Sequence, residues 1–302
     1  MKKSEFILVT GGEGFIGRYV CSKLIAQGKK VISLDQNILN RSTGRLTYKC
    51  DIANRDQLEQ IFKAHSFTQI VHLASLLNTA SRKNPKSATL VNIGGSLNIL
   101  EAACKFHVPR VIYGSSISVY GSKLGLGQEG VLETDSAMPE DIYGVAKRYV
   151  EILGDIYNQK FGIQFIALRI SSVVGPGAIT TSSRWRSDIF EKLGLPHKTK
   201  VSIPYRKDEM LPLVYVEDVA DMFGRLVDAE QVSFSVYNTP SEVWRLGKLK
   251  RYVESLDKNI QITFGQSSIS GIPRIINGQR FMTEFKYAPT SLKKHLRFAT
   301  QL

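Results

Sequence analysis

The sequence predicts an α/β fold, a doubly wound parallel sheet with a small C-terminal substrate-binding lobe. Two observations carry this prediction. Short apolar, β-prone runs alternate with segments of helical spacing through the first half of the chain. A glycine-rich turn joins the first such run, Phe6–Val9, to the first helical segment, Arg18–Gln27. With 302 residues and 43% apolar content, the chain can bury one large α/β core and a smaller appended unit.

The glycine turn reads TGGEGFIG over residues 10–17. The order strand, glycine turn, helix suits a dinucleotide pyrophosphate, because glycines let backbone N–H groups approach the phosphates and the helix N-terminus adds partial positive charge. We therefore expect a Rossmann-type cofactor site in the N-terminal half. The turn residues expected at the cofactor are Gly11, Gly14, Phe15, Ile16 and Gly17.

The second strand, Lys30–Leu34, ends on Asp35. An acidic residue about 20 positions after the glycines can accept hydrogen bonds from the adenosine ribose, and its charge repels a 2′-phosphate. This favours NAD over NADP. The alternative is that Asp35 only starts a turn, and Arg41 is near enough in sequence to accommodate a 2′-phosphate.

The third strand, Leu46–Lys49, leads to Asp51 and Ile52. A carboxylate at a strand end, followed by an apolar side chain, can bond the adenine amino group while the side chain covers the ring. We expect both residues at the cofactor.

The fourth strand, Gln69–Leu73, ends in the small residues Ala74 and Ser75. Small side chains let a cofactor lie against the backbone, so Leu73, Ala74 and Ser75 are expected to line its site. His72 lies inside this apolar strand and is interpreted as a hydrogen-bonded core histidine, because a polar group in a core needs a partner.

A helix over Ser87–Phe106 contains Asn92, and a fifth strand opens at Val111 and runs to Ser116. The helix from Ile142 holds Tyr143 and Lys147 one turn apart on one face. There the lysine is expected to lower the phenol pKa. With a hydroxyl such as Ser116, the pair can act as a proton shuttle for hydride transfer.

Taken in order, these motifs resemble the extended short-chain dehydrogenase/reductases, the NAD-dependent epimerase/dehydratase family. The matching motifs are Thr10-Gly11-x-x-Gly14-x-x-Gly17, Asp35, Asp51-Ile52, His72-Leu73-Ala74, Asn92, Ser115-Ser116-x-x-Val119-Tyr120-Gly121 and Tyr143-x-x-x-Lys147. The resemblance implies that Tyr143 is the acid/base, that Lys147 supports it and holds the nicotinamide ribose, and that Ser116 positions the reacting oxygen. It also implies that Asn92 braces the active-site helix through backbone or water contacts and that the chain forms a homodimer through the helices carrying Asn92 and Tyr143.

The resemblance divides the chain into an NAD-binding domain, residues 1–170, and a mainly substrate-binding lobe, residues 171–302. The strand at Leu213–Val216 is expected to return to the first domain. The residues expected at the substrate are Ser118, Ser172, Thr180 and Arg184.

Three functions remain open. Nucleotide-sugar epimerases are favoured as the largest group, although they often carry Asn at the place of Ser172 and Arg at that of Leu211. Arg184, Arg186, Arg206 or Arg274 could supply the missing cation. The run from Asp208 to Tyr215 resembles short-chain-type L-threonine dehydrogenases, and a non-catalytic cofactor-binding protein is the third reading.

Composition limits the partners and the cellular location that we expect. The net charge of +13 comes from basic residues spread over the whole chain without an aromatic-rich recognition motif, so we expect a basic surface and no specific nucleic-acid partner. The three cysteines lack metal-ligand spacing, so no metal site and a reduced, cytoplasmic location are expected. No apolar run has the roughly 20 residues that span a bilayer, and no membrane partner is expected.

Overall fold

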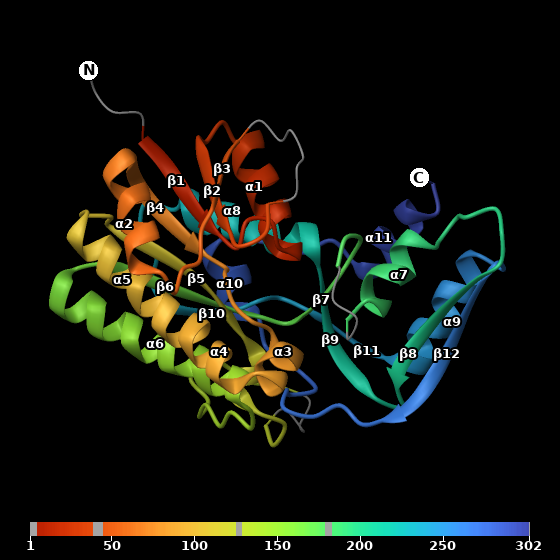
Figure 1. The fold of residues 1–302 in the computed structure, drawn as a ribbon. Helices are drawn as coiled ribbons and strands as arrows, with labels where there is room; N and C mark the ends of the chain where they lie inside the picture. The colour runs from red at the N-terminus through yellow and green to blue at the C-terminus, as the bar shows by residue number, and fades with distance from the viewer. Residues whose placement is uncertain (1–4, 39–44, 125–128, 179–182, 302) are drawn as a thin grey trace.

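The computed structural model describes residues 5–38, 45–124, 129–178 and 183–301. Its largest feature is a sheet of seven strands, all parallel, in the order β3-β2-β1-β4-β5-β6-β10 (Figure 1). The strands are β1 (Glu5–Thr10), β2 (Val31–Asp35), β3 (Leu46–Lys49), β4 (Ser66–His72), β5 (Arg110–Ser116), β6 (Gln164–Ile170) and β10 (Val236–Asn238). The strand order reverses between β1 and β4, and at such a switch point a crevice opens at the carboxyl ends of the strands.

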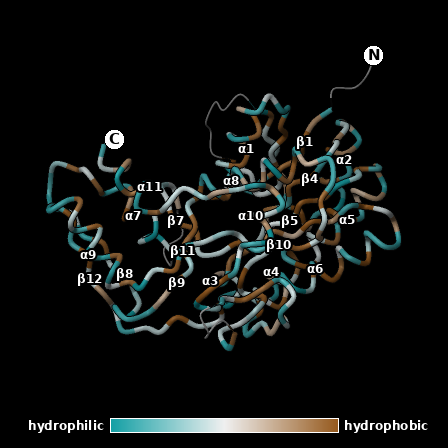
Figure 2. Tube along the Cα trace, turned by 180° about the vertical axis from the view of Figure 1, so that it is seen from behind, coloured by the Kyte–Doolittle hydropathy of each residue, from teal (hydrophilic) through white to brown (hydrophobic). Residues whose placement is uncertain are grey.

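Helices cover both faces of this sheet, which confirms the doubly wound α/β fold. One face packs against α1 (Phe15–Ala26), α8 (Val216–Asp228) and α10 (Gln279–Glu284). The other packs against α2 (Arg55–Ala64), α5 (Ser96–Lys105) and α6 (Ile142–Phe161). In Figure 2 the apolar colour gathers on the central strands between these layers, where the two cores lie.

The helical segment predicted over Ser87–Phe106 is not uniform. It comprises α4 (Pro85–Thr89), a π-helical turn (Leu90–Gly95) and α5, with the short α3 (Asn78–Lys83) before it. π-turns inside helices often occur at functional sites, and this one contains Asn92.

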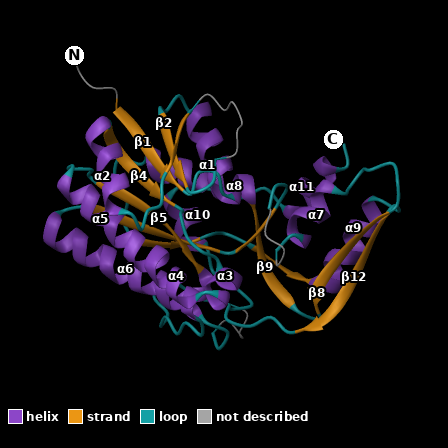
Figure 3. Cartoon of the chain, viewed as in Figure 1, coloured by secondary structure: helices purple, strands orange, loops and turns teal. Residues whose placement is uncertain are grey.

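The second lobe lies to the right in Figure 3 and is built from strands of two small sheets. β7 (Ser172–Val174), β9 (Met210–Tyr215) and β11 (Glu242–Arg245) form one, and β8 (Thr199–Tyr205) pairs with β12 (Ile260–Ser267) in the other. Packed with them are α7 (Trp185–Glu191), α9 (Leu246–Leu256) and α11 (Leu292–Ala299), around a third core.

The strand at Leu213–Val216 does not pair with the large sheet, and its expected return to the NAD-binding domain stays a prediction. Residues 213–215 belong to β9, which pairs in parallel with β7 and antiparallel with β11, and Val216 begins α8. The elements that return are α8 and β10, and β10 takes the sheet edge beside β6. An apolar run predicts a strand but not its partner. The division at residue 170 stays a prediction.

Candidate functional site

A cavity of about 710 Å³ opens where the carboxyl ends of β1, β4, β5 and β6 face the second lobe. Most of the residues predicted from the sequence line it together. They are Gly11, Gly14, Phe15, Ile16, Gly17, Asp35, Ile52, Leu73, Ala74, Ser75, Ser116, Ser118, Tyr143, Lys147 and Ser172. Segments more than 100 residues apart in sequence thus meet in one site.

The glycine turn is packed as a dinucleotide site requires. Gly14 caps α1 without a side chain of its own, and a Cβ on Gly17 would lie 2.0 Å from the carbonyl oxygen of Gly11. Only glycine at position 17 lets α1 begin this close to the turn. Backbone N–H groups at the start of α1 therefore face the cavity, a fit for the phosphates of a dinucleotide.

Asp35 and Asp51 occupy different positions. Asp35 lines the cavity, where Oδ2 accepts from the backbone N–H of Glu13 at 3.1 Å. The turn and the second strand are joined by this bond. Asp51 does not line the cavity, and its Oδ1 stabilises a turn by accepting from Ala53 N at 2.9 Å; its adenine contact stays a prediction.

A buried chain of hydrogen bonds connects the glycine turn to the π-helical turn. The Ser96 hydroxyl donates to the backbone oxygen of Asn92 at 2.7 Å, so Ser96 Oγ must accept from His72 Nε2, at 2.9 Å. The other ring nitrogen, Nδ1, then accepts from the Thr10 hydroxyl at 2.6 Å. His72 is therefore a satisfied core histidine, as predicted. Burial lowers its pKa to about 3.

Asn92 does not line the cavity but fixes its wall. Its Oδ1 accepts from Leu76 N at 2.7 Å and its Nδ2 donates to Leu76 O at 2.9 Å. Leu76 directly follows Ser75 in the lining. Both side-chain bonds thus go to the loop after β4, and the bracing of the active-site helix through backbone or water contacts stays a prediction.

Tyr143 lies in the first turn of α6, which Asp141 caps by accepting from Gly144 N at 2.8 Å. The Tyr143 hydroxyl is hydrogen-bonded by Ser116 and also by Ser75, whose polar role the sequence reading missed. A Cβ on Gly144 would lie 2.4 Å from the backbone oxygen of Ser118. Glycine at 144 thus lets α6 bring the phenol up to the end of β5.

The pKa of the phenol is raised in this geometry, and the expected lowering by Lys147 stays a prediction. Burial raises the pKa of Tyr143 to about 12, while hydrogen bonds from Ser116 and Ser75 act the other way. Lys147 Nζ lies 5.5 Å from the centroid of the Tyr143 ring and donates to Gly114 O at 2.7 Å. Burial lowers the pKa of Lys147 itself to about 7, so at neutral pH it carries only part of a charge.

Behind Lys147 lies a buried ion pair that the sequence reading did not identify. Arg169 donates to both carboxylate oxygens of Glu151, at 2.9 and 2.8 Å, and Ser115 Oγ donates to Oε1 at 2.6 Å. The negative charge of Glu151 raises the pKa of Lys147 against the effect of burial. The pair thus adjusts the charge of the active-site lysine.

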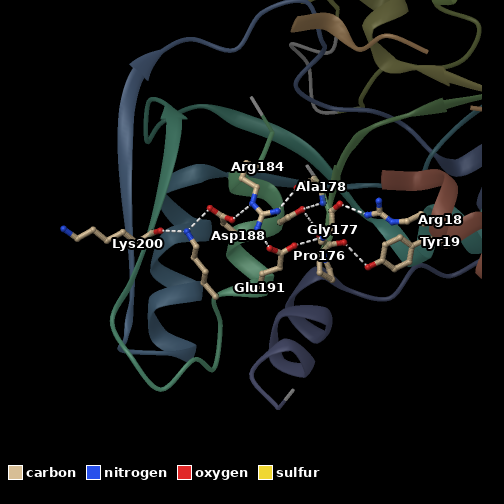
Figure 4. A network of polar contacts seen from close by, with 12 residues as sticks. Arg18, Tyr19, Pro176, Gly177, Ala178, Arg184, Asp188, Glu191 and Lys200 are labelled. Carbon is tan, nitrogen blue, oxygen red and sulfur yellow. Dashed lines mark hydrogen bonds and ion pairs between the residues drawn. The ribbon is translucent and has the colours of Figure 1, made fainter. Parts of the chain in front are cut away.

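At the substrate end, Ser118 and Ser172 line the cavity, and Thr180 is outside the described residues. Arg184 does not line it. Figure 4 shows its guanidinium directed at Asp188 and Glu191, and it also donates to Ala178 O at 2.8 Å. The geometry therefore assigns Arg184 to the loop around Gly177 and does not support substrate contact. Arg186, two residues on, lines the cavity instead.

In the described part of the chain, no three His, Cys, Asp or Glu side chains lie close enough to hold a metal ion. Cys21, Cys50 and Cys104 are free thiols. None of the helices in the described ranges is both long and apolar enough to cross a membrane.

The chain is similar to known proteins over most of its length. The model of the NAD dependent epimerase/dehydratase family matches residues 7–239. UDP-glucuronate 4-epimerase of Thermodesulfobacterium geofontis is 31% identical, with 77% of this chain and 74% of that protein covered. UDP-glucose 4-epimerase of Lacticaseibacillus casei is 30% identical over 56% of this chain, a match that spans about half (52%) of the relative's own length.

Two solved structures share the fold. A GalE-like L-threonine dehydrogenase from Cupriavidus necator is 20% identical with a TM-score of 0.88, covering 98% of this chain and 99% of its own. UDP-glucose 4-epimerase of Thermus thermophilus, in complex with NAD, is 21% identical with a TM-score of 0.84, and the match covers 99% of this chain and 98% of that chain.

Proposed function

Because the chain belongs to the NAD dependent epimerase/dehydratase family, whose cofactor is NAD, we propose that it interconverts a secondary alcohol and a ketone. The observation that carries this is the meeting of Ser116, Tyr143 and Lys147 in one cavity with the glycine turn. When bound, NAD supplies the hydride acceptor.

Ser116 holds the reacting oxygen of the substrate, and Tyr143 takes its proton. Once Tyr143 and Lys147 together have lost one proton, the proton that remains can be on either group. The form with phenolate and ammonium is the one that accepts the substrate proton. Lys147, held by Gly114 O, keeps that ammonium beside the phenol ring.

The favoured reaction is that of a nucleotide-sugar epimerase of the UDP-sugar 4-epimerase type. Similarity to UDP-glucuronate and UDP-glucose 4-epimerases supports it. The alternative is an NAD-dependent dehydrogenase of a small hydroxy substrate, like L-threonine. Leu211 favours this alternative, because it lines the cavity, 1% exposed, without the charge that a diphosphate would need there.

One experiment separates these reactions. Purified protein is mixed with NAD and a panel of UDP-, GDP- and dTDP-sugars and small hydroxy acids including L-threonine. Net cofactor reduction, followed by absorbance, identifies a dehydrogenase; a sugar of inverted stereochemistry without reduction identifies an epimerase. Tyr143→Phe should abolish either activity and retain NAD binding, and undiminished turnover in that variant would refute the site.

We also propose a homodimer formed through α5 and α6. The outer face of α6 exposes apolar side chains at intervals of three and four residues, which is the stripe of a helix that packs on another. They are Ile142, Val145, Tyr149, Ile152 and Ile156. Val145→Glu should convert a dimer to monomer in light scattering; a wild-type monomer contradicts the proposal.

The proposed location is the cytoplasm. The three free cysteines support it, since an oxidising compartment favours disulfides. Fractionation of expressing cells tests this location.

A further inference from the structure

The cavity contains a cation that no carboxylate balances. Arg186 lines it, and no Asp or Glu of the described residues forms an ion pair with its guanidinium. Its Nε is buried and, in the described part of the chain, has no hydrogen-bond partner. Residues 179–182, outside that part, read Ile-Thr-Thr-Ser and contain no acidic side chain.

The neighbours of Arg186 position its side chain but leave its charge uncompensated. Tyr205 hydrogen-bonds the guanidinium from β8, and the Trp185 ring centroid lies 5.6 Å from it. Burial lowers the pKa of Arg186. A desolvated cation without a counter-ion costs free energy, and an anion in the cavity would remove that cost.

Other arginines of the lobe are in a different situation. Arg184 pairs with Asp188 and Glu191, and Arg206 pairs with Glu209 at 2.7 Å. Arg274 is exposed and does not line the cavity. Of the four candidates for a substrate-binding cation, Arg186 is the one that lines the same cavity as Ser116, Tyr143 and Lys147.

We propose that Arg186 and Tyr205 form an oxyanion subsite that receives a carboxylate or phosphate group of the substrate. This inference rests on the proposed function, because it names the substrate class of the same cavity. The planar guanidinium offers paired N–H donors that match the two oxygens of either group. The substrate is then a secondary alcohol or ketone that also carries an anionic group.

Two simple anions test the subsite without any reaction. Inorganic pyrophosphate and malonate are titrated by calorimetry into NAD-saturated protein, and the tighter of the two identifies phosphate or carboxylate as the preferred group. Arg186→Met should weaken that anion about tenfold or more, the usual effect of losing a charge-assisted hydrogen bond. Arg186→Lys keeps the charge without the planar donors and should weaken it less. Arg274→Met, the matched control, should bind like the wild type.

NAD affinity is measured in every variant and should stay unchanged. The proposal is overturned if neither anion binds the wild type, if Arg186→Met binds as tightly, or if NAD affinity falls in parallel, which would place Arg186 in the cofactor site. Neither probe contains a secondary alcohol, so inactivity toward the substrate panel would refute the proposed reaction and leave this test standing. Melting temperatures identify a variant that fails to fold. If Arg186→Met does not fold, the anion affinity of Arg186→Lys tests the proposal in its place.

Discussion

Glu151→Gln tests whether the buried ion pair behind the active site sets the charge of Lys147. Glu151 and Arg169 are 1% and 3% exposed, and their two hydrogen bonds measure 2.9 and 2.8 Å. Removing one partner of such a pair leaves a buried charge alone, which costs about 3–5 kcal/mol of the free energy of unfolding. Since the Glu151 charge raises the pKa of Lys147, its loss lowers that pKa below the present value of about 7.

The variant is assayed in two ways. Urea denaturation measures the loss of stability, and the pH profile of alcohol oxidation measures the first proton loss of the Tyr143–Lys147 pair. In the wild type the rate should rise with pH through about 7, and in Glu151→Gln the rise should move to lower pH. The control is Arg148→Gln, which removes the half-exposed partner of the same carboxylate at 3.0 Å and should cost under about 1 kcal/mol. If the rate of Glu151→Gln rises at the same pH as that of the wild type, or at a higher pH, the reasoning is refuted.

Three further predictions concern the frame of the site. Gly144→Ala places a Cβ 2.4 Å from the backbone oxygen of Ser118, so turnover should fall at least about tenfold and stability by about 1–3 kcal/mol; wild-type kinetics would contradict this. The folded-state pKa of His72, about 3, lies below its ordinary 6.5, so the unfolded state binds the proton first as pH falls. Stability should drop by about 2–3 kcal/mol from pH 6.5 to 4.5, and His72→Gln should remove this part of the slope in urea titrations. Asn92→Ala leaves the backbone of Leu76 unpaired and should weaken NAD binding in calorimetry, at a stability cost of about 1–3 kcal/mol; unchanged affinity would argue against it.

The cofactor half was readable from the sequence because its signals are local. The order of strand, glycine turn and helix over 5–26 fixes the phosphate site within one continuous segment, and Asp35 follows at the end of the next strand. The second lobe offers no such order. Its β8 and β12 are paired across more than 50 residues, and β10, only three residues long, joins the large sheet in place of β9. Partner choice there depends on tertiary packing, which apolar periodicity does not record.

Roles that depend on burial were the least predictable. Tyr143 and Lys147 one turn apart suggested a charged lysine beside a phenolate, yet burial raises the pKa of the phenol and lowers that of the lysine. Glu151 lies one further turn along the same helix, and its carboxylate raises the pKa of Lys147 against the effect of burial. Spacing alone identified the groups but not the net sign of their pKa shifts.

The substrate end shows that some missed information was present in the spacing. Arg184 was expected at the substrate, yet it is four residues before Asp188 and seven before Glu191, a spacing that favours ion pairs along a helix. Arg186 has Ile189 and Phe190 at the positions three and four residues on, where a helix would supply a counter-charge. It stands among the apolar residues of α7 without a local partner. When helical spacing leaves a cation without a partner and its segment packs against the site, that cation is the one we expect to bind an anionic ligand.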